Sequence, residues 1–172
     1  MPNRTRTSLV LACLLLAGAG ASTGQTVTAG RGDLPLTVPS SYTADTPAPL
    51  IVLLHTYGRT GKIQDDYMGL SARADAYGFI MVAPDGTPSQ AANNPLFWNA
   101  SSACCNWEGQ ELDDSTYLLH LIEAVKADYA IDPKRVFVVG HSNGAFMAHR
   151  LAHDHSEVIA AIVSIAGADQ SE

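Results

Sequence analysis

Basic residues are scarce in this chain, and those present are scattered. The 172 residues include 10 Lys and Arg against 17 Asp and Glu, which gives a formal net charge of −7 at pH 7. Proteins that bind nucleic acids neutralise phosphates with clustered Lys and Arg. The composition therefore argues against a nucleic-acid partner. The sequence also has no internal repeat and no low-complexity segment.

Motifs for cofactors and metals are absent as well. No Gly-x-Gly-x-x-Gly follows a strand-like apolar run, and no glycine-rich loop ends in a phosphate-binding lysine. His149 and His153 are four residues apart, as in a zinc-binding helix. However, Arg150 stands where such a helix carries a glutamate after its first histidine. We therefore expect no cofactor and no metal site.

No apolar run is long enough to span a membrane. The apolar stretch 9–17 follows Arg4 and Arg6 and precedes Ala19-Gly20-Ala21, a small-x-small cleavage pattern. This arrangement predicts a signal peptide over residues 1–21 and no membrane span. We expect the remainder, residues 22–172, to form part of one catalytic domain that is secreted, either extracellular or periplasmic.

Cysteine is also rare, with three residues in the chain. Cys13 lies in the predicted signal peptide, which leaves Cys104 and Cys105. They could form a vicinal disulfide, remain free, or pair with cysteines beyond residue 172. Export disfavours free thiols, and Cα atoms about 3.8 Å apart across a trans peptide are closer than a disulfide usually allows. These considerations favour an outside partner.

Apolar runs of strand length alternate with segments that suit helices. Such alternation predicts an α/β fold with a mostly parallel sheet and helices on both faces. A short outer strand is expected at 34–39, where proline is tolerated at a sheet edge. The predicted buried strands are 50–54, 79–83, 136–139 and 160–166, and the predicted helices are 63–77, 113–129 and 145–152.

The segment 136–152 has the pattern of a nucleophile elbow. Four residues typical of a buried strand precede Gly140-His141-Ser142-Asn143-Gly144, and a helix-forming segment follows. A Gly-x-Ser-x-Gly between strand and helix holds its serine in a sharp, strained turn, and the small residues on either side make room for that turn. The pattern predicts that Ser142 is a nucleophile.

Several motifs together resemble secreted polyhydroxybutyrate depolymerases and the related feruloyl and acetyl-xylan esterases. The resemblance implies an α/β-hydrolase fold and a serine carboxylic ester hydrolase acting on polyhydroxyalkanoate or plant-cell-wall esters through an acyl-enzyme on Ser142. The family continues well past residue 172, so we expect the last strands and helices to be missing. The residues that carry the resemblance are 53–58, 83–86, Trp98, Cys104-Cys105, Asp113-Asp114 and 135–144.

The oxyanion hole of this fold combines two backbone N–H groups. One belongs to the residue after the nucleophile, here Asn143, and the other to the loop after an early strand. Tyr57 is the preferred second donor, with Thr56 as the adjacent alternative. Thr56 replaces the glycine usual in the family, and a β-branched residue resists positive φ.

The catalytic acid and base are not evident in the sequence. The triad of this fold runs Ser, acid, His along the chain, yet no histidine follows Asp169. His55 is the nearest substitute base, while His149, His153 and His155 are expected to point away from the site. Asp113 and Asp114 are expected at a helix start. We therefore expect the 172-residue chain to be inactive.

Two tryptophans are candidates for substrate binding. Trp98 and Trp107 could stack on an aromatic acyl group or line a groove for a polymer, or they could simply bury apolar area. Two other functions remain open for the chain: a non-catalytic binding protein that kept the fold, and a serine peptidase. Nothing in the sequence indicates an oligomeric state.

Overall fold

The computed structural model describes residues 25–169. The predicted signal peptide, residues 1–21, lies outside that range. Within the described residues, no helix is both long and apolar enough to cross a membrane.

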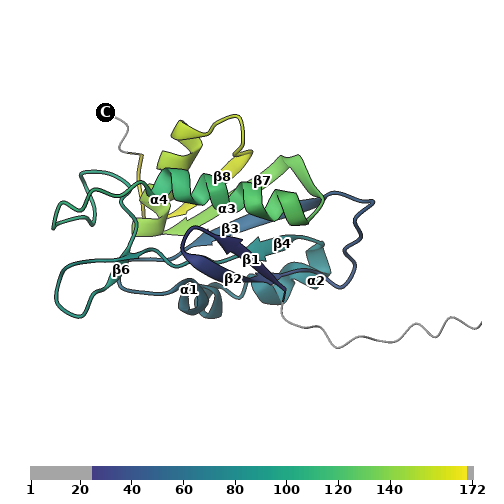
Figure 1. The fold of residues 1–172 in the computed structure, drawn as a ribbon, viewed down its shortest axis with the longest axis horizontal. Coiled ribbons are helices and arrows are strands. Elements are labelled where there is room, and N and C mark those ends of the chain that lie inside the picture. The colour runs from purple at the N-terminus through teal and green to yellow at the C-terminus, as the bar shows by residue number, and fades with distance from the viewer. Residues whose placement is uncertain (1–24, 170–172) are drawn as a thin grey trace, which may run out of the picture.

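A six-stranded sheet forms the centre of the molecule (Figure 1). Its strand order is β1-β2-β4-β3-β7-β8. The strands β4, β3, β7 and β8 are parallel to one another, whereas β1 and β2 form an antiparallel hairpin at one edge. The mostly parallel sheet predicted from the alternating pattern is thus confirmed. The strands are β1 Thr26–Ala29, β2 Gly32–Thr37, β3 Ala48–Leu54, β4 Ile80–Val82, β7 Ile131–His141 and β8 Ala161–Ile165.

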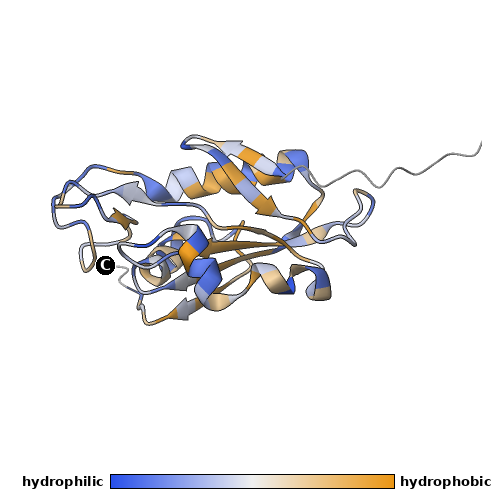
Figure 2. Cartoon of the chain, turned by 90° about the horizontal axis from the view of Figure 1, so that it is seen from below, coloured by the Kyte–Doolittle hydropathy of each residue, from blue (hydrophilic) through white to orange (hydrophobic). Residues whose placement is uncertain are grey.

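Helices cover both faces of the sheet, as predicted. The helices α3 Asp114–Asp128 and α4 Asn143–Asp154 lie on one face, and α1 Gly61–Met68 and α2 Ala74–Tyr77 lie on the other (Figure 1). Alternate residues of β3 serve the two layers: Leu50, Val52 and Leu54 join the α3–α4 core, while Leu53 joins a smaller core with Ala74. The apolar colouring accordingly runs along the central strands (Figure 2).

The two edges of the described sheet differ from the expectation. The hairpin partner β1 lies outside β2, so the strand predicted at 34–39 is not the edge strand. Pro35, which has no N–H to donate, lies opposite Thr26 of β1. The pairing of β2 with β4 begins only at Leu36, so Pro35 has no partner in β4. At the other edge, 160–166 was predicted to be a strand of the buried type that lacks its neighbouring strand in this chain. Accordingly, β8 exposes 51% of Val163 and 43% of Ile165, because no described strand pairs with its outer side.

The helix predicted over 63–77 is broken into pieces. Gly69 ends α1 with φ 67°, and its N–H donates to the carbonyl of Asp65. A short 3₁₀ turn, Ser71–Arg73, and α2 follow, and Gly78 ends α2 in the same left-handed conformation. Glycine adopts positive φ at little cost, so the two glycines set these helix ends.

The two aspartates at the start of α3 have different roles. Asp113 is the N-cap, and its carboxylate accepts the Thr116 N–H at 3.0 Å. This hydrogen bond lowers the pKa of Asp113. Asp114 is fully buried, where it forms an ion pair with Arg31 and accepts the Asn99 N–H at 2.6 Å. It therefore ties the β1–β2 turn and a long loop to α3, a role beyond helix capping.

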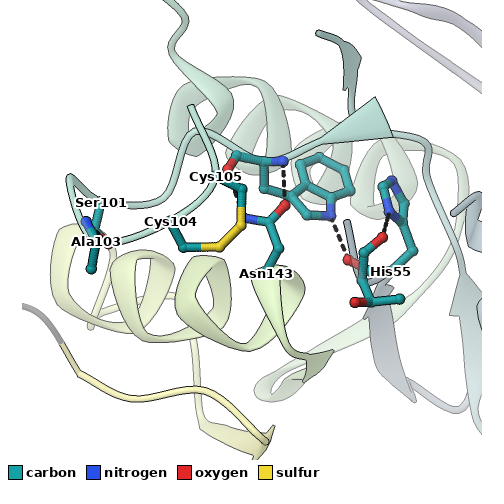
Figure 3. The surroundings of a disulfide bond; sticks show 8 residues. His55, Ser101, Ala103, Cys104, Cys105 and Asn143 are labelled. Atoms are coloured by element: carbon teal, nitrogen blue, oxygen red, sulfur yellow. Dashed lines mark hydrogen bonds between the residues drawn. A yellow bond between two sulfur atoms is a disulfide. The ribbon is translucent and has the colours of Figure 1, made fainter. Parts of the chain in front are cut away.

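The segment 87–113 is mostly irregular, apart from the small hairpin of β5 Thr87–Pro88 and β6 Leu96–Phe97. Cys104 and Cys105 form a disulfide with each other within this segment (Figure 3). The expected pairing with a cysteine beyond residue 172 is therefore wrong in this structure. The peptide bond between the two residues is cis.

We predict that Asp114→Asn lowers the free energy of unfolding by about 2–3 kcal/mol. A fully buried pair that loses one partner costs about 3–5 kcal/mol, and the partial exposure of Arg31, 28% of its side chain, reduces that cost. Urea unfolding measures the effect. The control is Asp66→Asn, which breaks an exposed pair with Lys62 and should cost under about 0.5 kcal/mol. Equal costs for both variants would contradict the role of Asp114.

We predict that the exported protein carries the Cys104–Cys105 disulfide. Proteolysis without reduction should release one peptide that holds both cysteines and is two hydrogen atoms lighter than its reduced form. Alkylation should label neither sulfur until a reductant is added. A peptide that links either residue to a different cysteine would show the pairing to be wrong.

Candidate active site

Ser142 lies in a sharp turn between β7 and α4, as the elbow pattern predicts. Its φ and ψ are 52° and −116°, a conformation that non-glycine residues rarely adopt. The Ser142 N–H donates to the Ile165 carbonyl of the neighbouring strand region at 2.8 Å, and the Ser142 carbonyl accepts the Ala145 N–H at 2.8 Å. Such strain persists only where the surrounding contacts hold it, and it concentrates at functional positions.

The glycines on either side of Ser142 leave no room for a side chain. A Cβ at Gly140 would lie 2.1 Å from the Gly144 carbonyl oxygen, and a Cβ at Gly144 would lie 2.3 Å from the Leu54 carbonyl oxygen. Because backbone atoms make both contacts, the neighbours have little freedom to move away. The small residues expected beside a nucleophile elbow are therefore required by packing.

The two candidate oxyanion donors, the N–H groups of Asn143 and Tyr57, have no hydrogen-bond partner in residues 25–169, although Asn143 itself is fully buried. The Asn143 N–H is in the first turn of α4, where helical N–H groups have no partner within the helix. Tyr57 follows β3, whose end pairs with the end of β7 through Leu54 and Gly140. The Tyr57 N–H makes no hydrogen bond to any residue in 25–169.

The alternative donor, Thr56, is already occupied. Its N–H donates to Gln64 Oε1 at 3.1 Å. The anticipated conflict between a β-branched residue and positive φ does not arise, because Thr56 is not among the described residues with positive φ. Gly58 takes that conformation instead, with φ 70°, and its N–H donates to the Leu96 carbonyl at 2.8 Å.

His55 is a structural residue in this arrangement. Its side chain is fully buried, Nε2 accepts the Gly86 N–H at 2.8 Å, and Nδ1 lies 2.8 Å from the Thr56 carbonyl oxygen. Since Nε2 accepts, Nδ1 must carry the proton that it donates to Thr56. Burial lowers the pKa of His55, although the hydrogen bond to Thr56 opposes that shift. A neutral ring with both nitrogens occupied cannot act as the substitute base.

Trp98 belongs to the core, which corrects its assignment as a substrate-binding residue. Its side chain is completely buried, and its indole N–H donates to the His55 carbonyl at 3.2 Å. Burial leaves no surface of the ring for a ligand. The backbone of Trp98 also pairs with the Asn143 side chain: its N–H donates to Oδ1 at 2.7 Å, and its carbonyl accepts the side-chain N–H of Asn143 at 2.9 Å.

Trp107 remains accessible. It exposes 68% of its surface and makes an edge-on contact with the Tyr57 ring, with the ring centroids 4.9 Å apart. The exposed indole therefore adjoins the residue whose backbone N–H is free.

No histidine in residues 25–169 makes a hydrogen bond to the Ser142 hydroxyl. His141 is half-buried and stacks on Tyr67 with the ring centroids 5.9 Å apart. His153 and His155 lie at the far end of α4, as expected, and His155 Nε2 is 3.1 Å from the Ser115 hydroxyl.

Two buried amides contribute to the site without a sequence motif that marks them. The side chain of Asn143 anchors the loop at Trp98 to the elbow, and the side chain of Gln64 binds the loop after β3. Asn143 lies inside the elbow motif, but the motif uses only its backbone. Gln64 lies on the inward face of α1, as does Met68 four residues later. A polar residue on this face was the only feature of the sequence that could have identified Gln64 as part of the site.

Comparisons of the sequence with known proteins find a depolymerase and an esterase that resemble this chain. A poly(3-hydroxyalkanoate) depolymerase C of Paucimonas lemoignei is 32% identical over 130 residues, which cover 76% of this chain and 30% of that protein. Feruloyl esterase B of Neurospora crassa is 30% identical over 165 residues, covering 94% of this chain and 54% of that protein. The chain thus spans from about a third to about half of these relatives.

Solved structures give the same result for the fold. The acetyl xylan esterase of Aspergillus awamori superposes with a TM-score of 0.59 at 25% sequence identity, covering 81% of this chain and 50% of that one. The sequence matches the Esterase PHB depolymerase family over residues 35–171, which is most of its length. This chain therefore belongs to the PHB depolymerase esterase family and carries part of the α/β-hydrolase fold.

Proposed function

We propose that this chain provides the nucleophile and oxyanion hole of an exported serine carboxylic ester hydrolase. The observation that carries the proposal is the strained Ser142, held between β7 and α4, with two candidate oxyanion donors, the N–H groups of Asn143 and Tyr57, that have no partner in residues 25–169. Membership of an esterase family supports the reaction class. The signal-peptide pattern of residues 1–21 supports secretion, either extracellular or periplasmic.

In the proposed reaction, the Ser142 hydroxyl attacks the ester carbonyl and loses its proton to a general base. The tetrahedral intermediate collapses to an acyl-enzyme and releases the alcohol, and water then attacks the acyl-enzyme to release the acid. The N–H groups of Asn143 and Tyr57 stabilise the negative oxygen in both steps. One such donor contributes about 2.7–4 kcal/mol to the transition state.

We propose that the general base comes from outside residues 25–169. His55 is occupied by Gly86 and Thr56, and the other described histidines make no hydrogen bond to the Ser142 hydroxyl. The relatives named above are about two to three times as long as the aligned segment. A histidine in such a further segment fits the Ser, acid, His order of this fold.

The proposed substrates are polyhydroxyalkanoates or plant-cell-wall esters. Relatives named as a poly(3-hydroxyalkanoate) depolymerase and as a feruloyl esterase match similar spans of this chain. The exposed Trp107 beside Tyr57 offers an apolar surface next to the proposed oxyanion hole and suits either class.

The lack of a base beside Ser142 in the described residues favours one alternative, a non-catalytic binding protein. In that case, ester ligands should bind with an affinity that Ser142→Ala does not change, and no turnover should follow. A serine peptidase would instead cleave short peptides faster than short esters.

We predict that Ser142→Ala abolishes hydrolysis of p-nitrophenyl butyrate by the full-length protein, because the acyl-enzyme can no longer form. Loss of a triad nucleophile lowers kcat by about 10⁶. An organophosphonate should modify Ser142, as peptide mass mapping can verify. Ser164→Ala in β8 is the matched control and should retain activity. Phosphonate on a different residue would disprove the assignment of the nucleophile.

We predict that residues 22–172, produced alone, are inactive and poorly soluble. Without a base, kcat should fall by about 10⁶, and the unpaired apolar edge of β8 favours association between copies. Ester assays and size-exclusion chromatography test both points against the full-length protein. A monomeric fragment that hydrolyses esters at the full-length rate would refute the proposal of an external base.

A further inference from the structure

Gln64 is a buried polar residue whose partners belong to two separate parts of the proposed site. It lies in α1 and exposes only 2% of its surface. A buried amide costs free energy unless its polar atoms are paired. The identity of those partners therefore indicates what the residue does.

The side-chain amide of Gln64 connects the loop after β3 with the nucleophile elbow. Its Oε1 accepts the Thr56 N–H at 3.1 Å, and its Nε2 faces His141 Nδ1 at 3.5 Å. Thr56 directly precedes the proposed donor Tyr57, and His141 directly precedes the proposed nucleophile Ser142.

The helix that carries Gln64 is itself firmly anchored. The Thr60 hydroxyl caps its start by accepting the Ile63 N–H at 3.1 Å, and the Gly61 N–H donates to the Asp85 carboxylate at 2.7 Å. A Cβ at Gly61 would lie 2.1 Å from the Ala83 carbonyl oxygen, so the helix start packs directly on the end of β4. Gln64 therefore reaches both partners from a fixed support.

The peptide planes of the loop explain why this bridge matters. The plane between His55 and Thr56 is held at both ends: Trp98 donates to its carbonyl, and Gln64 accepts its N–H. In the next plane, the Thr56 carbonyl points to the His55 ring. Since N–H and C=O point in opposite directions across a trans peptide, the Tyr57 N–H points away from that buried ring.

We propose that Gln64 is a positioning residue that fixes the oxyanion loop relative to the nucleophile elbow. Because Gln64 occupies the Thr56 N–H and fixes the orientation of this loop, the Tyr57 N–H is left to act as the second oxyanion donor. This inference rests on the proposed esterase function. Gln64 touches neither the substrate nor the reacting atoms, and it acts through Thr56 and His141.

Kinetics of the full-length protein test the proposal through Gln64→Met, which keeps a similar side-chain length but removes both polar contacts. We expect kcat for p-nitrophenyl butyrate to fall about 10- to 100-fold, the loss typical of a misplaced catalytic group. The KM should stay nearly unchanged, whereas the thermal midpoint should fall by a few degrees, because the Thr56 N–H loses its acceptor. Gln64→Glu, which retains an acceptor for the Thr56 N–H, should recover most of the lost kcat.

The control is Lys62→Met, on the exposed side of the same helix, which should leave kcat unchanged. A loss below twofold in Gln64→Met would overturn the proposal. A fall in kcat that follows a loss of folded protein, without rescue by Gln64→Glu, would also overturn it, since a purely structural role predicts that result.

Amide hydrogen exchange separates this proposal from the esterase proposal. By NMR, the Thr56 amide should exchange at least about tenfold faster in Gln64→Met than in the wild type. The Gly86 amide, held by His55, should be unaffected. If the wild type hydrolyses no ester, the esterase proposal fails while protection at Thr56 still supports the bridge. Equal exchange at Thr56 in both proteins would overturn the bridge itself.

Discussion

The close contact between the elbow and the end of β3 is the constraint on which the site depends. Gly144 lies so near the carbonyl oxygens of Leu54 and His55 that a Cβ would approach them to 2.3 Å and 2.7 Å. This contact presses the start of α4 against the loop that follows β3. It brings the Asn143 N–H and the Tyr57 N–H to the same end of the sheet, which is where ligands bind in open α/β sheets.

Around that contact, buried polar groups hold the loops in place. The Asn143 side chain fixes the backbone of Trp98, the Trp98 indole holds the His55 carbonyl, and the His55 ring binds Gly86 and Thr56. Each of these groups is buried and hydrogen-bonded, so a change at one leaves its neighbour with an unmet and costly polar group. The strain at Ser142 is thus supported by a connected set of hydrogen bonds as well as by packing.

The sequence predicts the sheet and the elbow because both depend on local patterns. Runs such as Leu50–Leu54 mark buried strands, and Gly-x-Ser-x-Gly between strand and helix marks the turn at Ser142. The left-handed conformation of Gly69, which breaks the first helix, was less apparent because glycine is also tolerated within helices. The sequence does not indicate whether Cys104 pairs with Cys105 or with another cysteine.

Contacts between distant segments account for the remaining differences. Burial of Trp98 follows from its bonds to Asn143 and His55, which lie 45 and 43 residues away along the chain. Similarly, the ion pair of Arg31 with Asp114 joins residues 83 apart. No sequence spacing links such distant positions. From the sequence alone, Trp98 could therefore be assigned either to substrate binding or to the core. The accessible Trp107, by contrast, remains a substrate-binding candidate.

The most direct test is a crystal structure of the full-length protein with an organophosphonate bound to Ser142. A phosphonyl oxygen occupies the position of the oxyanion. The account predicts that this oxygen accepts the N–H groups of Asn143 and Tyr57 at about 2.7–3.1 Å, with the Thr56 N–H still bound to Gln64. A phosphonyl oxygen held by the Thr56 N–H, or a Tyr57 N–H directed away from it, would contradict the account.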